Sequence, residues 1–96
     1  MNWIAKQPYY KVERRITSLE QTTSVEHRIM YLYEERIVTK YREFAITEVF
    51  DLSYRALGPD GGLLYLHTQQ GVYSYMVSTQ PQSFIEAYKQ LVVKNN

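Results

Sequence analysis

The two histidines, His27 and His67, are the side chains best suited to acid–base or metal chemistry, but neither lies in a metal-binding pattern. A metal site needs at least three converging ligands, and neither histidine has the other as a near neighbour in the sequence. The chain has no cysteine, which removes thiolate ligands, disulfides and cysteine nucleophiles. We therefore expect no metal site and no bound cofactor.

A serine–histidine–aspartate set can be assembled from Ser74, His67 and either Asp51 or Asp60. In hydrolases with a nucleophile elbow, the serine lies on a sharp turn between glycines, and no glycine-flanked serine occurs here. We therefore expect a protein without catalytic activity. A cryptic enzyme is the disfavoured alternative.

The glycines that follow Asp60 superficially resemble a phosphate-binding loop. Such loops lead from a strand into the N-terminus of a helix, whereas Gly61 and Gly62 lead into the apolar run of residues 63–66. This pattern predicts a β-turn rather than a nucleotide site.

The cations form two groups that are candidates for anion binding: Lys11, Arg14 and Arg15, and then Lys40 and Arg42. Glutamates interrupt the first group and flank the second, and the formal net charge is only +1. We expect a solvated sheet face of mixed charge, with binding of a phospholipid headgroup or another anion as the alternative. The weak net charge also argues against a nucleic-acid partner.

Tyrosine is unusually frequent, with 10 copies among 96 residues. Tyrosine suits half-buried sheet surfaces and is enriched at interfaces because its hydroxyl can stay hydrated. The best candidates for a binding face are Tyr31 and Tyr33 on one strand and Tyr73 and Tyr75 on another, since alternate residues share a face. The reverse orientation stays open, with Tyr73 and Tyr75 in the core and their neighbours outside.

The elements that must position these side chains are mostly strands. Residues 1–8 are expected to form an entry arm, and residues 9–78 the antiparallel sheets, with a first strand near 9–19 and a polar turn at 20–24. A hairpin over 25–46 turns at Glu34 and Glu35 and returns over 37–44. A strand over 46–57, a loop over 58–62 and a hairpin over 63–77 follow.

The pattern changes to a helical period after residue 78. Phe84, Ile85, Tyr88, Leu91 and Val92 are spaced so that they form one apolar stripe. Residues 79–96 are therefore predicted to form a capping helix, over about 81–94, with a short tail. Because one face of this helix is apolar, it must pack on the sheet.

The bulk properties are those of one small folded domain over residues 1–96. Hydrophobic residues make up 45% and charged residues 22%, which is ordinary globular composition. No apolar run reaches the length of a signal peptide or of a membrane helix. We expect a cytoplasmic protein without a transmembrane segment.

The order of strands followed by one amphipathic helix resembles the bacterial pleckstrin-homology-like (PH-like) domains. The residues that carry the resemblance are Glu35–Lys40, Ile46–Arg55, Gly62–Val77 and Pro81–Lys89. The chain is similar in particular to the short Bacillus-type proteins that include the sublancin immunity protein. This resemblance implies a mainly β fold, a partly open antiparallel β-barrel of six or seven strands capped by the C-terminal α-helix.

The leading functional expectation is a non-catalytic binding or adaptor module. It would offer a sheet edge or a tyrosine-rich face to a protein or peptide, with a second copy of the chain among the expected partners. The alternative implied by the resemblance is peripheral association with a membrane or anionic lipid, linked to peptide-antibiotic immunity.

Overall fold

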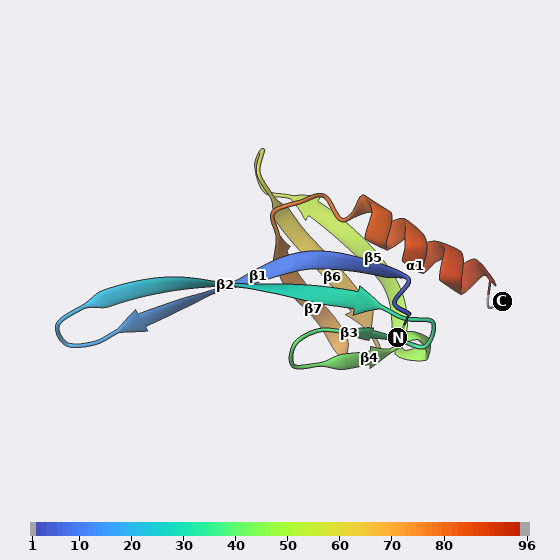
Figure 1. Cartoon of the computed structure of the whole chain (residues 1–96), viewed down its shortest axis with the longest axis horizontal. Helices are drawn as coiled ribbons and strands as arrows, with labels where there is room; N and C mark the ends of the chain where they lie inside the picture. The colour runs from blue at the N-terminus through green and yellow to red at the C-terminus, as the bar shows by residue number, and fades with distance from the viewer. Residues whose placement is uncertain (1, 95–96) are drawn as a thin grey trace.

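The computed structural model describes residues 2–94, which contain seven strands and one α-helix (Figure 1). The elements in chain order are β1 (Ala5–Ile16), β2 (Gln21–Leu32), β3 (Arg36–Val38), β4 (Glu43–Ala45), a 3-10 turn (Ile46–Glu48), β5 (Val49–Ala56), β6 (Gly62–Thr68), β7 (Gly71–Val77) and α1 (Gln82–Lys94).

All seven strands belong to one antiparallel sheet in the order β4-β3-β2-β1-β7-β6-β5, and this sheet does not close. Its two halves meet where β1 and β7 pair at Tyr10 and Met76. The helix α1 contacts β1 and β5. The prediction of an open antiparallel sheet with a single C-terminal helix is therefore confirmed.

The core lies between the inner face of the bent sheet and α1. Along β6, buried and half-buried residues alternate without interruption, as expected for a strand with one face in the core. Phe84, Tyr88 and Leu91 of the helix are buried against this face, and the Tyr88 hydroxyl donates a hydrogen bond of 2.9 Å to the Val49 carbonyl. The predicted apolar stripe of α1 is thus the face that packs against the sheet.

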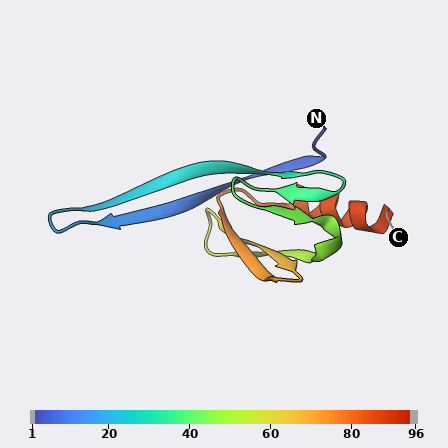
Figure 2. The ribbon, with the colours of Figure 1, turned by 90° about the horizontal axis from the view of Figure 1, so that it is seen from below.

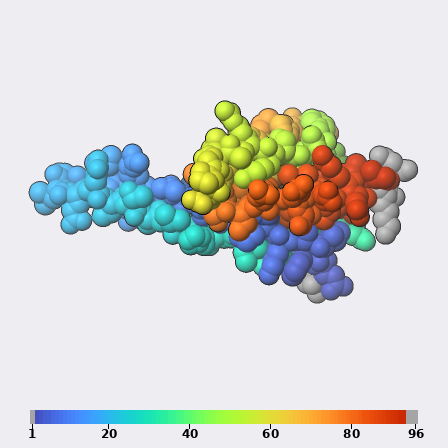
Figure 3. Space-filling view, turned by 90° about the horizontal axis from the view of Figure 1, so that it is seen from above, coloured from blue at the N-terminus to red at the C-terminus, as the bar shows by residue number. Residues whose placement is uncertain are grey.

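β1 and β2 form a long two-stranded ribbon that projects from the rest of the molecule (Figures 1 and 3). They pair over their whole lengths, from Ala5 with Leu32 to Ile16 with Gln21. The principal extents are 56 × 27 × 27 Å and the Cα radius of gyration is 15.0 Å. A compact chain of this length has a radius of about 12.5 Å, so the projecting ribbon gives the molecule its elongated shape.

Two predicted boundaries in this region are wrong. The entry arm does not extend to residue 8, because β1 begins at Ala5. Pro8 has no amide hydrogen to donate, but β1 is paired only with β2 at this position, so the strand tolerates it. The turn predicted at residues 20–24 lies at Thr17–Glu20, where Thr17 and Glu20 exchange hydrogen bonds. The polar residues 21–24 instead extend β2, since both faces of the ribbon are exposed there.

The return strand predicted over residues 37–44 is also wrong, because it is broken into β3 and β4. A tight turn at Thr39–Arg42 separates them, with the Thr39 hydroxyl accepting a hydrogen bond of 3.1 Å from the Arg42 amide. The turn at Glu34 and Glu35, the loop before β6, the β6–β7 hairpin and the helix lie where the sequence predicts them, within one or two residues.

Candidate functional sites

The outer face of the ribbon is the first candidate site. Directly paired residues of antiparallel strands point to the same side, so the register assigns every ribbon residue to one of two faces. The inner face continues the core face of the sheet through Tyr9 and Met30, which are buried. The outer face comprises Lys6, Pro8, Tyr10, Val12, Arg14, Ile16, Gln21, Thr23, Val25, His27, Ile29 and Tyr31.

This outer face carries aliphatic side chains that are open to solvent. Val12 and Val25 are paired with each other and are 40% and 49% exposed, and Ile29 is 39% exposed. Figure 2 shows the ribbon along one side of the molecule, with the second half of the sheet on the other side. The aliphatic residues Val12, Val25 and Ile29 of the outer face are therefore partly open to solvent.

The carboxylates of β1 and β2 lie on one face of the ribbon, whereas the cations lie on both. Lys6 and Arg14 lie on the outer face, whereas Glu13 and Glu26 lie on the inner face. Both strands were expected to mix their charges, since glutamates interrupt the cations in the sequence. The alternation of side chains instead leaves the outer face with cations and no carboxylate.

Aromatic rings gather at the base of the outer face. The ring centroids of Trp3 and Tyr31 lie 5.9 Å apart, and those of Tyr31 and Tyr33 lie 6.4 Å apart. The Lys6 ammonium lies 5.3 Å from the centroid of Trp3. Further along the ribbon, Tyr10 lies beside His27 with centroids 6.3 Å apart.

The four tyrosines singled out from the sequence do not form one patch. Tyr31 is half-buried on the outer side of β2, as the outward orientation predicts, and Tyr33, directly after this strand, is half-buried as well. Tyr73 and Tyr75 are half-buried but pack against the core, while Val72 and Met76 beside them are exposed. The reverse orientation, which the sequence left open, is thus the one found for β7.

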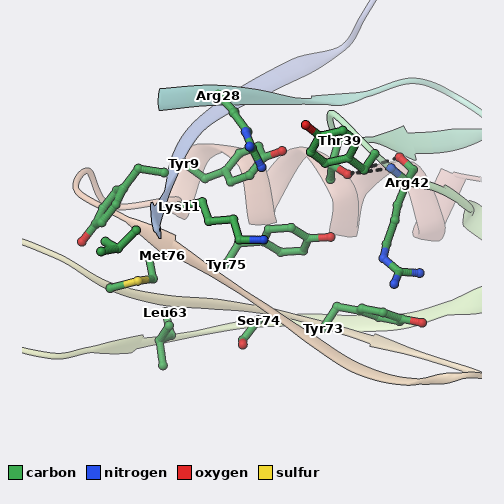
Figure 4. A pocket seen from close by; sticks show the side chains of 13 residues that line it. Tyr9, Lys11, Arg28, Thr39, Arg42, Leu63, Tyr73, Ser74, Tyr75 and Met76 are labelled. Atoms are coloured by element: carbon green, nitrogen blue, oxygen red, sulfur yellow. Dashed lines mark hydrogen bonds between the residues drawn. The ribbon is translucent and has the colours of Figure 1, made fainter. Parts of the chain in front are cut away.

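The second candidate site is a pocket of about 520 Å³ at the base of the ribbon. It opens where β1 and β7 separate beyond their one residue pair, and the β3–β4 turn forms its third side (Figure 4). Its charged lining residues are Lys11, Arg28 and Arg42, with no aspartate or glutamate among the lining residues. Five tyrosines also line it: Tyr9, Tyr10, Tyr41, Tyr73 and Tyr75.

The walls of this pocket are fixed by contacts between distant segments. The Tyr9 hydroxyl accepts a hydrogen bond of 3.1 Å from the Lys40 amide, which holds the β3–β4 turn to β1. Tyr9 packs edge-on against Tyr75 with centroids 5.1 Å apart. The Arg42 guanidinium lies 4.8 Å from the centroid of Tyr73, within cation–π range. Burial, as the largest effect, raises the pKa of Tyr75.

Arg28 is the most enclosed cation of the pocket. Its side chain is only 8% exposed, and its Nε has no hydrogen-bond partner among residues 2–94. Burial alone would lower the pKa of Arg28, but the hydrogen bond and charge of Glu26 raise it. The hydrogen bond from Arg28, and next the charge of Arg28, lower the pKa of Glu26. The Arg28 guanidinium also lies 4.9 Å from the centroid of Tyr41.

The five cations proposed from the sequence are divided by the fold. Lys11 and Arg42 line the pocket, and Lys40 lies on the turn that closes it, with its ammonium 5.7 Å from the centroid of Tyr41. Arg14 and Arg15 lie far out on the ribbon and on opposite faces. Sequence reasoning missed Arg28, although it lies on the same face as Lys11, because the register of β1 and β2 was not known.

A serine–histidine pair occurs on the outer face of β5 and β6. Ser53 Oγ lies 2.7 Å from His67 Nε2, and Asp51 is paired with His67 across the strands. Ser74, the serine considered from the sequence, lies on β7 instead, where it is paired with Tyr65 of β6. Ser53 and His67 lie outside the pocket lining, and their contact is accounted for as a hydrogen bond on a sheet surface.

Two features are absent from residues 2–94. In this part of the chain, no three histidine, aspartate or glutamate side chains gather as metal ligands. No helix within it combines the length and the apolar character that a membrane crossing requires.

Comparison of the chain with models of known protein families found no match, and a search of curated proteins found no significant relative.

Proposed function

We propose that this chain is a non-catalytic recognition module that docks on a protein partner through the outer face of the β1–β2 ribbon. The observation that carries the proposal is an exposed apolar face on a projecting two-stranded ribbon, bordered by cations and free of carboxylates. A two-stranded hairpin is only marginally stable in water unless a further strand or a helix covers it. A partner that covers this face would stabilise the ribbon as well as the complex.

The size of the face suits a protein surface. Twelve residues per strand at about 3.3 Å per residue give a length of roughly 40 Å. Contiguous exposed apolar patches on monomeric proteins commonly mark interaction sites. Trp3, Tyr10 and Tyr31 supply the kind of rings that dominate binding energy at protein interfaces.

The charge of the face specifies the partner. Lys6 lies near one end of the ribbon and Arg14 near the other, with valines and tyrosines between them. Complementary charge guides association and excludes partners of the same sign. The expected partner therefore presents an apolar strip between carboxylates.

The test is site-specific crosslinking in cells that make the chain. A photoreactive amino acid replaces Val25 on the outer face or, as a matched control, Ser24 on the inner face. We expect discrete protein adducts from position 25 and at most traces from position 24. Adducts of the same kind from both positions, or none from position 25, would contradict docking through the outer face.

An anionic membrane surface is the second candidate occupant. It is favoured by the absence of carboxylates on the outer face and by the ring of Trp3 beside Tyr31 and Lys6, because aromatic rings and cations suit the lipid headgroup region. Trp3 is the single tryptophan, so its fluorescence reports on this face alone. A blue shift with phosphatidylglycerol vesicles, and no shift with phosphatidylcholine vesicles, would favour the membrane over the protein partner.

A further inference from the structure

The pocket at the base of the ribbon carries an inference that is independent of the outer face. Within residues 2–94, β1 and β7 pair only at Tyr10 and Met76. Beyond this point β1 continues into the ribbon, while β7 runs back towards Gly71 (Figure 1). The edge of β7 from Gly71 to Tyr75 therefore has β6 on one side and no strand on the other.

A strand edge of this kind presents backbone amides and carbonyls that an added strand can pair with. Addition of an extended peptide to an open edge is a general mode of recognition, in which the main chain supplies hydrogen bonds and pockets for alternate side chains supply specificity. The pocket lies directly beside this edge, since Tyr73, Ser74 and Tyr75 of β7 belong to its lining.

The cations of the pocket specify the side chains that it would take. Lys11 and Arg42 line it and form no ion pair in the described part of the chain. Arg28 is paired with Glu26, but no described residue offers its buried Nε a hydrogen-bond acceptor. A buried donor without an acceptor is uncommon in folded proteins, and a carboxylate oxygen from a ligand would supply one.

We propose that this pocket binds an extended acidic peptide segment that adds to the free edge of β7. Side chains alternate along a strand, so a segment with carboxylates at every second position directs all of them to one side. On that side they meet Lys11, Arg28 and Arg42, and the intervening side chains of the segment point away from these cations. The tyrosine rings of the wall pack against the methylenes of the acidic side chains.

The open strand edge distinguishes a peptide from a small anion. A free phosphate would be held by the cations alone and would leave the amides and carbonyls of the β7 edge unpaired. A peptide satisfies both the cations and the edge. The proposed site and the outer face of the ribbon are lined by largely different residues, so either can fail without the other.

The experiment uses the full chain and two capped hexapeptides, Thr-Glu-Thr-Glu-Thr-Glu and Thr-Lys-Thr-Lys-Thr-Lys. Binding and backbone amide exchange are followed by nuclear magnetic resonance. The glutamate peptide is expected to bind and to slow amide exchange in β7 between residues 71 and 75. The lysine peptide is expected to leave these amides unchanged.

Two charge reversals locate the site. Arg42→Glu is expected to weaken binding of the glutamate peptide roughly three- to tenfold, the range for a partly exposed charge contact. Arg55→Glu makes the same change on β5, outside the pocket lining, and is expected to leave binding nearly unchanged. Lys11→Gln provides a second, milder test at a position that is exposed on the ribbon.

Four results would overturn the proposal. The first is equal binding of the two peptides, and the second is equal loss of binding in the Arg42 and Arg55 variants. The third is binding without slower exchange in β7, because it would show that the cations hold carboxylates without strand addition. Inorganic phosphate that binds where the glutamate peptide does not would likewise assign the pocket to a small anion.

Discussion

At the scale of single residues, Gly62 shows how closely neighbouring strands approach. It begins β6 opposite Ala56, and a Cβ atom at this position would overlap the Arg55 carbonyl oxygen and lie 2.9 Å from Ala56 Cα. Both contacts are with backbone, so relief requires the two strands to move apart. The absence of a side chain, rather than an unusual φ, is what this position needs.

The first prediction follows from that contact. Gly62→Ala should lower the free energy of unfolding by about 1–3 kcal/mol, as overpacking usually does, measured by urea denaturation. Gln69→Ala, in the exposed β6–β7 turn, is the control and should change stability by at most about 0.5 kcal/mol. A Gly62→Ala variant as stable as the control would show that β5 and β6 are farther apart than described.

The orientation of the tyrosines shows what single residues can and cannot reveal before the fold is known. Alternation along β7 predicts that Tyr73 and Tyr75 share a face, which is correct, but both faces of β7 carry large side chains. The choice depends on Phe44, whose ring centroid lies 5.0 Å from that of Tyr73, and on Tyr9, which packs on Tyr75. These partners are distant in the sequence, so no local pattern identifies them.

At the scale of elements, α1 is the element whose packing contributes most to the stability of the sheet. Phe84 is 1% exposed, whereas Val93 on the same helix is 74% exposed. Phe84→Ala should therefore lower the free energy of unfolding by about 3–5 kcal/mol, a large part of the roughly 5–15 kcal/mol of a small domain. Val93→Ala should cost little. Equal effects of the two substitutions in thermal or urea unfolding would mean that α1 does not plug the sheet as described.

Elements were predictable from the sequence where one face is buried and turns are marked by glycine or proline. The β6–β7 hairpin and α1 satisfy both conditions, since β6 alternates strictly and glycine residues flank its two turns. The ribbon satisfies neither, because its outer half has two exposed faces and its turn at Thr17–Glu20 contains no glycine. Its polar residues were consequently assigned to a turn rather than to a strand.

At the scale of the whole molecule, the projecting ribbon makes the chain longer than its length in residues implies. The Cα radius of gyration is 15.0 Å, against about 12.5 Å for a compact chain. Small-angle X-ray scattering of the free protein should give a radius clearly above the compact value and an elongated distance distribution. A compact radius would show that the ribbon folds back and that its outer face is covered by the chain itself.

The fold also decides which candidate sites exist at this scale. Alternation along β1 separates Arg14 from Arg15, and the register of β1 and β2 brings Lys11 to the same side as Arg28. The divergence of β1 from β7 then creates the pocket. Neither event is visible in the order of residues, because each depends on pairing between segments that are far apart.

The most direct test of the outer-face account compares two adjacent arginines. The crosslinker at position 25 is combined with Arg14→Glu, on the outer face, or with Arg15→Glu, on the inner face. Both variants change the charge by the same amount one residue apart, so general electrostatics and expression are matched. Adduct yield should fall severalfold with Arg14→Glu, because the reversed charge would repel an acidic partner, and stay near the parent value with Arg15→Glu. An equal fall in both variants, or no fall with Arg14→Glu, would contradict recognition through the outer face of the ribbon.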